Sequence, residues 1–133
     1  YRDARFMPDG ISVVALADRT GEVEVWVVPV DGTTPARAVT TGATVTRREA
    51  FPSPDGRYVA HQDQDQRLWV HEVAKGAAHE VAHGTHGAFR DLRWSPDGQW
   101  LAYVQPAVNA LSRIWLYGVT DGRARPVTTE RFD

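Results

Sequence analysis

The stretch "YRDARFMPDG" (Tyr1–Gly10) decides the fold, because the chain repeats it as "FRDLRWSPDG" (Phe89–Gly98) without a gap. A third copy, "RREAFPSPDG" (Arg47–Gly56), lies between these two with more drift. The Pro-Asp-Gly triplets are 46 and then 42 residues apart. Self-similarity at a period of roughly 20–50 residues is typical of repeat architectures, in which each copy is one supersecondary unit. The chain therefore consists of three copies of one unit.

Two further markers recur in constant order in every unit. A tryptophan stands in an apolar segment, at intervals of 43 and 46 residues, and a short segment then closes the unit. These markers place the three units at residues 1–42, 43–84 and 85–133. The tryptophans are Trp26, Trp69 and Trp115, and the closing segments "ARAVTTG", "AHEVAHG" and "ARPVTTE" end at Gly42, Gly84 and Glu130.

Each unit contains four short segments with the composition of β-strands. In the third unit these are "DLRWS" (91–95), "QWLAYV" (99–104), "RIWLYGV" (113–119) and "ARPVTT" (124–129). Pro-Asp-Gly separates the first two and Asp-Gly the last two, and both are turn sequences. No window of ten residues shows the i, i+3, i+4, i+7 spacing of an amphipathic helix. The units are therefore expected to be all-β.

The apolar pattern indicates how these strands pack. "VWVVPV" (Val25–Val30) is apolar on both faces, so both faces of this strand are expected to be buried. The fourth segment of the third unit is more polar and contains Pro126, which an outer edge strand tolerates. Sheets covered on both faces and repeated at this period are typical of propeller blades. We predict an all-β fold, a partial β-propeller of three four-stranded antiparallel blades, with the repeated tryptophans in its core.

The composition narrows the classes of partner. With 42% hydrophobic and 24% charged residues the chain reads as globular, and its net charge of −2 argues against nucleic acid or a membrane as partner. There is no cysteine, which excludes disulfides and thiolate metal sites. The chain begins "YRDARF", with neither an initiator methionine nor a signal-peptide pattern, so we expect it to be a piece of something longer.

The stretch "HEVAHGTH" (His79–His86) contains H-E-x-x-H, the pattern of zinc metalloproteases. In register with the other units it is a fourth strand, not a helix. Residues i and i+4 are roughly 6 Å apart on a helix but about 13 Å apart on a strand, too far for His79 and His83 to share one zinc ion. His86 falls in the following loop. We therefore predict no metal site, although the role of these histidines stays open.

Other catalytic patterns are also missing from the sequence. None of the four serines lies in G-x-S-x-G, and there is no phosphate-binding loop or G-x-G-x-x-G. We expect no catalytic residue and no cofactor in this chain. The Pro-Asp-Gly triplets are interpreted as structural turns, because Pro fixes φ, Asp bonds its own backbone and Gly supplies a positive φ. The turn residues are Asp9, Gly10, Asp55, Gly56, Asp97 and Gly98.

One polar feature repeats without an obvious role in a turn. Just before each first strand an arginine precedes an acidic residue, and the first strand of a propeller blade borders the central channel. The repeated pairs are candidates for a charged channel lining; alternatively, each pair links neighbouring blades by ion pairs. They are Arg2–Asp3, Arg48–Glu49 and Arg90–Asp91.

The segments "SPDGRYVAHQDQDQRLWVHEVAKG" (53–76) and "LRWSPDGQWLAYVQPAVNALSRIWLYGVTDGRARPVTTERFD" (92–133) resemble the propeller repeats of tricorn proteases. They look most like the seven-bladed propeller of that family. "DQRLW", "SRIWLYGVTDG" and the closing "RFD" carry this likeness, whereas Pro-Asp-Gly repeats are shared with TolB propellers and the prolyl oligopeptidase group.

The resemblance implies a large cytoplasmic serine peptidase that trims peptides released by other proteases. Its propellers act as channels and filters, and its catalytic Ser, His and acid lie in other domains, so none is carried over to this chain. The expected partners are peptides in the channel and the rest of the parent peptidase. The alternative is a TolB-like propeller that binds proteins and has no link to proteolysis.

An arc of three blades leaves one face of the first blade and one face of the third uncovered. Exposed apolar patches of that kind commonly bind a partner. We therefore expect self-association through these faces, possible closure into a six-bladed ring included. The alternative is that the sequence is a truncated part of an intact propeller.

Overall fold

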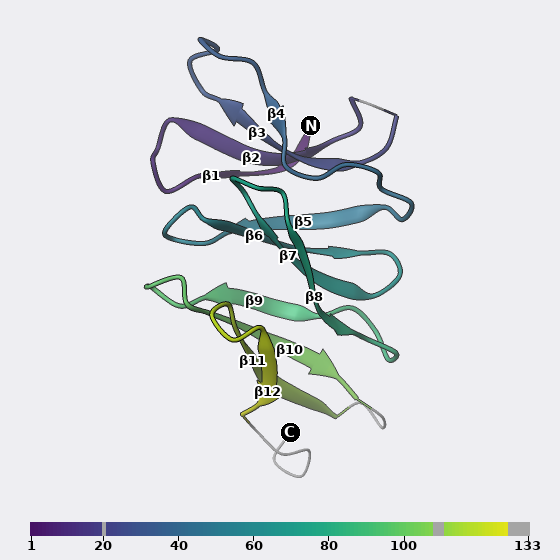
Figure 1. Cartoon of the computed structure of the whole chain (residues 1–133). Helices are drawn as coiled ribbons and strands as arrows, with labels where there is room; N and C mark the ends of the chain where they lie inside the picture. The colour runs from purple at the N-terminus through teal and green to yellow at the C-terminus, as the bar shows by residue number, and fades with distance from the viewer. Residues whose placement is uncertain (20, 108–110, 128–133) are drawn as a thin grey trace.

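The computed structural model describes residues 1–19, 21–107 and 111–127, and this part of the chain contains β-strands but no α-helix. It therefore contains no helix long and apolar enough to cross a membrane. The strands form three four-stranded antiparallel sheets, stacked one above another (Figure 1). The end of the predicted last segment and the closing "RFD", within residues 128–133, lie outside the described residues. The predicted fold class, three antiparallel blades of a propeller, is confirmed.

Each blade is one sheet whose strands follow one another in chain order. Blade 1 contains β1 (Arg2–Phe6), β2 (Ser12–Ala17), β3 (Glu24–Pro29) and β4 (Arg37–Ala38). Blade 2 contains β5 (Arg47–Pro52), β6 (Tyr58–Asp63), β7 (Arg67–Glu72) and β8 (Ala78–His83). Blade 3 contains β9 (Arg90–Trp94), β10 (Trp100–Pro106), β11 (Ser112–Gly118) and β12 (Arg123–Pro126).

The Pro-Asp-Gly triplets form the turns between the first and second strands. In blade 3 the Asp97 carboxylate accepts hydrogen bonds from the Gln99 N–H at 3.0 Å and the Ser95 hydroxyl at 2.6 Å. Gly98 has φ +72° and donates its N–H to the Ser95 carbonyl at 2.9 Å. Asp55 and Gly56 in blade 2 repeat this arrangement, and Asp9 and Gly10 in blade 1 form the same turn with Ser12 as the hydroxyl partner.

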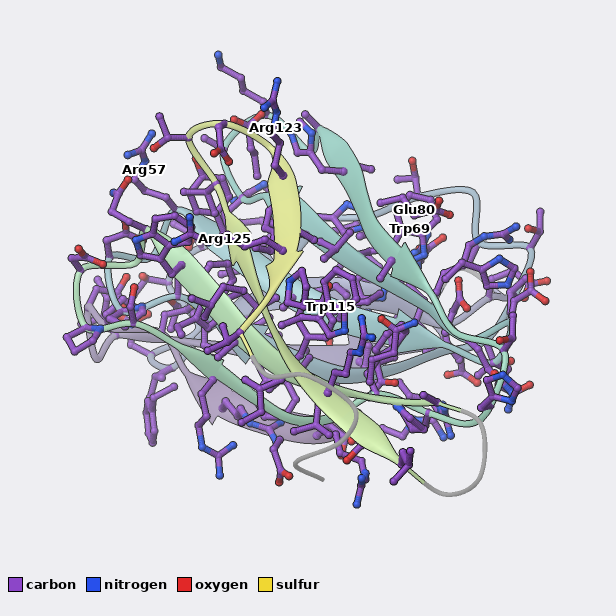
Figure 2. All side chains as sticks on the ribbon, turned by 90° about the horizontal axis from the view of Figure 1, so that it is seen from below. Arg57, Trp69, Glu80, Trp115, Arg123 and Arg125 are labelled. Atoms are coloured by element: carbon purple, nitrogen blue, oxygen red, sulfur yellow. The ribbon has the colours of Figure 1, made fainter. Side chains whose placement is uncertain are left out.

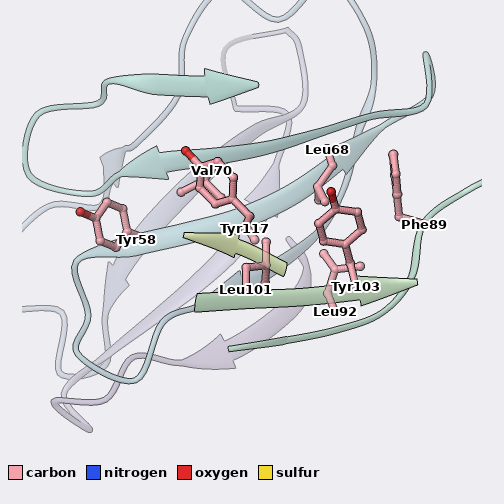
Figure 3. Close-up of a cluster of buried hydrophobic side chains, with 9 residues drawn as sticks. Tyr58, Leu68, Val70, Phe89, Leu92, Leu101, Tyr103 and Tyr117 are labelled. Carbon is pink, nitrogen blue, oxygen red and sulfur yellow. The ribbon is translucent and has the colours of Figure 1, made fainter. Parts of the chain in front are cut away.

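The core lies between the blades. The face of blade 1 that carries Val14, Leu16 and Val25 packs on blade 2 at Ala50 and Val59. A second cluster joins blades 2 and 3 (Figure 3), where side chains of both sheets interdigitate. Its blade 2 members are Tyr58, Ala60, Leu68 and Val70, and its blade 3 members are Phe89, Leu92, Leu101, Tyr103 and Tyr117. Burial of alternate residues toward each neighbour is what a two-sided sheet requires.

The repeated tryptophans are less uniformly buried than the sequence pattern predicts. Trp26 is 9% exposed, but Trp69 and Trp115 are only half-buried. Seen from the blade 3 end, Trp115 lies near the middle of the sheets and Trp69 lies beside Glu80, its cross-strand partner (Figure 2). The prediction of three core tryptophans is therefore right for Trp26 and only partly right for the other two.

The two end faces of the stack are partly open. Phe6, Ile11 and Val30 on the outer side of blade 1 are 67%, 68% and 58% exposed. Val127, which follows β12 on the outer side of blade 3, is 57% exposed. The prediction that both faces of Val25–Val30 are buried therefore fails at its end: Val25 is fully buried, but no sheet covers Val30.

Candidate functional site

The repeated Arg–acid pairs come together at the edge of the stack formed by the first strands. The structure contains a cleft of about 500 Å³ there, which we call the inner cleft. It is lined from all three blades, and Gln62 of β6 forms part of its wall. Of the six predicted residues, five line this cleft and Asp91 does not; the five are Arg2, Asp3, Arg48, Glu49 and Arg90.

The acidic member of each pair has an unusual backbone conformation. Asp3, Glu49 and Asp91 have φ of +55°, +57° and +56°, in the left-handed region that residues other than glycine rarely adopt. The register with the second strand is irregular at the same place in every blade, which indicates a β-bulge. The bulge turns the side chains at this point away from regular alternation. The sequence did not predict it, although the recurrence of an acid after arginine marks the position.

The ion-pair alternative for these residues is not what the structure contains. In the part of the chain that is described, the ion pairs within 4.0 Å are Arg47–Glu24, Arg67–Asp65 and Arg67–Glu80, and none of them involves a repeated pair. Gln62 links blades 2 and 3 at this edge instead. Its amide donates to Glu49 at 2.8 Å and to the Phe89 carbonyl at 2.9 Å, and it accepts from the Phe89 N–H at 2.8 Å.

The arginines of the inner cleft lie at the protein surface, whereas Glu49 accepts a hydrogen bond from Gln62. Arg2, Arg48 and Arg90 are exposed, and the guanidinium groups of arginine bind carboxylates with paired hydrogen bonds. Three guanidinium groups face two carboxylates, so the cleft offers both signs of charge.

The histidines of "HEVAHGTH" lie on a strand, as the repeat register predicts. His79 and His83 are exposed on β8 and pair with Val70 and Arg67 of β7, four positions apart along the strand. No group of three or more His, Cys, Asp or Glu side chains that could hold a metal ion occurs within the described ranges. His86 follows in the loop before β9.

The sequence analysis missed a second polar cluster, buried between blades 1 and 2. His61 and His71 are fully or nearly fully buried, and their rings stack with centroids 4.7 Å apart. Arg47 donates to Nε2 of His61 across 3.3 Å and forms an ion pair with Glu24 at 3.0 Å. The signal was available in the repeat register: Ala15 and Tyr103 occupy the place of His61 in the other units, and Val28 and Tyr117 that of His71.

Charge in this cluster is confined to the Arg47–Glu24 pair. Burial alone raises the pKa of Glu24, but hydrogen bonds from Thr40, Ala43 and Arg47 outweigh it and hold that pKa below its ordinary value. Burial, reinforced by Arg47, lowers the pKa of His71 to about 4. Burial, His71 and Arg47 lower the pKa of His61 well below its ordinary value as well. Both imidazoles are therefore neutral near pH 7.

Comparison with known proteins places the chain among propellers. No family model matches it. It is 31% identical over 122 residues to tricorn protease homolog 1 of Streptomyces coelicolor. The aligned region covers 81% of this chain and 11% of the relative. The chain thus spans about a tenth of the length of that relative.

Two solved structures share the fold at low sequence identity. The tricorn protease crystal structure superposes with a TM-score of 0.79 at 12% identity, over 96% of this chain and 13% of that one. TolB from Acinetobacter baumannii superposes with a TM-score of 0.72 at 13% identity, over 97% of this chain and 32% of that one.

Proposed function

Because the chain is a three-bladed segment of a tricorn-like β-propeller, we propose that it lines a channel that admits and filters peptides for a tricorn-like serine peptidase. One observation carries this proposal. The first strands of three blades bring Arg2, Arg48 and Arg90 to one cleft, each on the same side of a β-bulge. Repeated charge along a channel wall is what selection of passing peptides needs.

In this proposal the chain itself does not hydrolyse anything. Its parent is a cytoplasmic hydrolase, and the partners of the chain are passing peptides and the remaining domains of that parent. The inner cleft binds a peptide weakly and in more than one register, because exposed arginines on separate strands form contacts with any carboxylate or carbonyl within reach. Weak binding is the property a filter requires, since a tightly held peptide blocks the passage.

The proposal is tested by NMR titration of the full chain with end-blocked hexapeptides of acidic, neutral and basic composition. We expect shift changes at Arg48, Arg90 and Gln62, with acidic peptides binding most tightly. We expect the replacement of Arg2, Arg48 and Arg90 together by Gln to lower the affinity for acidic peptides about tenfold, because charge-assisted hydrogen bonds are lost.

Arg93→Gln is the matched control, because Arg93 is an exposed arginine of β9 that does not line the inner cleft. It should leave peptide binding unchanged. If no peptide moves a resonance of the inner cleft at millimolar concentration, the channel proposal fails.

A TolB-like role is the second candidate, and the TolB superposition over 97% of this chain favours it. In this case the chain serves as a scaffold that binds a folded protein, without a link to proteolysis. The triple arginine variant separates the two candidates. If the chain is a scaffold, the variant loses the binding of a protein partner, and its binding of peptides does not change. The parent protein also differs, since only the first candidate requires it to hydrolyse peptides.

A further inference from the structure

The face of blade 2 that looks toward blade 1 departs from the repeat. Its counterpart in blade 3 carries Leu101, Tyr103 and Tyr117 and packs as an apolar face. On blade 2 the positions that match the two tyrosines are His61 and His71. A pair of tyrosines is enough at these positions to pack blade 3 on blade 2. Blade packing therefore does not explain why this face carries histidines.

A second cleft, of about 540 Å³, opens over this polar face, and we call it the outer cleft. It exists because β4 is only two residues long, whereas β8 in blade 2 is six. Beside the short strand, a cleft separates part of the blade 2 face from the loop that follows β4. Trp69 and His71 of β7 form its floor, and the loop that follows β4 forms its opposite wall.

His71, Trp26 and Tyr103 each have a buried polar side-chain atom without a hydrogen-bond partner among the described residues, and of these three only His71 lines the outer cleft. It is 5% exposed and lines the outer cleft, yet neither ring nitrogen has a hydrogen-bond partner among the described residues. Its stacked neighbour His61 differs, because both of its ring nitrogens have partners, Arg47 and the Gln62 carbonyl. Buried polar groups are nearly always paired. Both ring nitrogens are buried, and because His71 lines the outer cleft, a ligand in that cleft is the partner that we consider for them.

The cleft that His71 faces is rich in positive charge. The lining includes Arg37, Arg47 and Lys75, with Arg67 further along β7 and Asp63 as the one carboxylate among the described lining residues. Asp63 already accepts hydrogen bonds from the Trp69 indole and two backbone N–H groups, and Arg67 is paired with Asp65 and Glu80. Arg47 is paired with Glu24, so Arg37 and Lys75 are the cations of this lining that form no ion pair among the described residues, and the hydrogen-bonded Asp63 carboxylate lies in the same lining.

We propose that the outer cleft binds an oxyanion, a carboxylate or a group of sulfate type, which accepts a hydrogen bond from the His71 ring and lies between the side chains of Arg37 and Lys75. This site is separate from the inner cleft, so it does not depend on the channel proposal. The oxyanion comes either from a free small molecule or from an acidic side chain of a peptide, and the two sources share this chemistry.

The environment of His71 makes binding depend on pH. The charged or titratable groups that act on its ring are Arg47 of β5, Glu24 of β3, His79 of β8 and the stacked His61 of β6. The pKa of His71 is about 4 in the free protein because burial and Arg47 disfavour the imidazolium. A bound anion favours it, so binding takes up a proton and tightens as the pH falls.

The test is titration of the full chain with sodium sulfate, which keeps both charges over this pH range, followed by His71 ring-nitrogen NMR and calorimetry. We expect saturable binding at millimolar sulfate, about fourfold tighter at pH 5 than at pH 7.5. His71→Phe should weaken it at least tenfold and abolish the pH dependence. Arg37→Gln should weaken it several-fold and keep the pH dependence.

The controls separate this site from general charge attraction and from misfolding. Arg93→Gln, at an exposed arginine of β9 that lines neither cleft, should leave sulfate binding unchanged, and thermal unfolding establishes that each variant is folded. Binding that survives His71→Phe, or no saturable binding at all, overturns the proposal. Acetate and an end-blocked Asp-containing tripeptide form two further arms: tighter binding of the peptide identifies an acidic side chain as the source, and tighter binding of acetate a free anion.

Discussion

At the scale of single residues, the buried polar groups between blades 1 and 2 set how the protein responds to acid. Glu24 and Arg47 form an ion pair whose side chains are only 4% and 12% exposed. Removing one member of such a pair leaves the other charge buried without a partner, which typically destabilises a fold by about 3–5 kcal/mol. The Glu24 carboxylate also accepts hydrogen bonds from the Thr40 hydroxyl and the Ala43 N–H, so its burial is tolerated.

The two buried histidines give a prediction for stability against pH. Their pKa values are lowered in the folded state, so the unfolded chain binds more protons below its ordinary histidine pKa of 6.5. The free energy of unfolding is thus expected to be constant above pH 6.5 and to fall below it. Each histidine contributes up to about 1.4 kcal/mol per pH unit, which for His71 continues to about pH 4.

Urea unfolding between pH 7.5 and 5 measures this slope. His71→Phe should remove about half of it, because one of the two buried imidazoles is gone. His83→Phe, at an exposed strand position, should keep the wild-type slope. An unchanged slope in His71→Phe would contradict the burial of that ring in its neutral form.

At the scale of elements, the bulge in each first strand is the feature that recurs in all blades. Because Asp91 has a φ of +56°, a β-branched side chain at this position is strained, whereas glycine is not. We expect the free energy of unfolding of Asp91→Gly to lie within about 0.5 kcal/mol of the wild-type value. For Asp91→Val we expect a free energy of unfolding about 1–2 kcal/mol lower than that of the wild type.

Chemical denaturation of the two variants checks this expectation. Arg93→Val on the same strand is the control, since Arg93 is exposed and has no positive φ. It should change stability by less than about 0.5 kcal/mol. Equal stability of Asp91→Val and Arg93→Val would mean that the strand adopts regular geometry in solution.

At the scale of the whole molecule, the open end faces predict self-association. Each blade packs its later face on the earlier face of the next, so the outer face of blade 3 matches the outer face of blade 1 in a second copy. Phe6 and Val30 lie on that face of blade 1 and are more than half exposed. We expect sedimentation velocity to show species larger than a monomer that grow with protein concentration.

A charge on this face provides the comparison. Phe6→Asp should shift the distribution toward the monomer, because association then buries an unpaired carboxylate. Asp97→Asn, in an exposed turn, should leave the distribution as in the wild type. A wild-type chain that stays monomeric at the highest concentration would remove this proposal and favour the truncated-propeller alternative.

The sequence by itself determined the architecture, because its evidence is local and repeated. Turn chemistry at Pro-Asp-Gly, apolar strands between the turns and a constant order of markers depend only on neighbouring residues. The same register placed His79 and His83 on a strand and so removed the metalloprotease interpretation. The limits of the blades and the channel role of the Arg–acid pairs stay predictions.

The tertiary structure decided what the gaps between blades contain. The bulges at Asp3, Glu49 and Asp91, the link through Gln62 and the outer cleft all depend on how two sheets approach each other. His61 and His71 show the reason most clearly. In sequence they are two scattered histidines, ten positions apart, and only the pairing of β6 with β7 stacks their rings and buries them against blade 1. Contacts between distant residues follow from packing, and a strand pattern specifies which face a residue is on but not what covers that face.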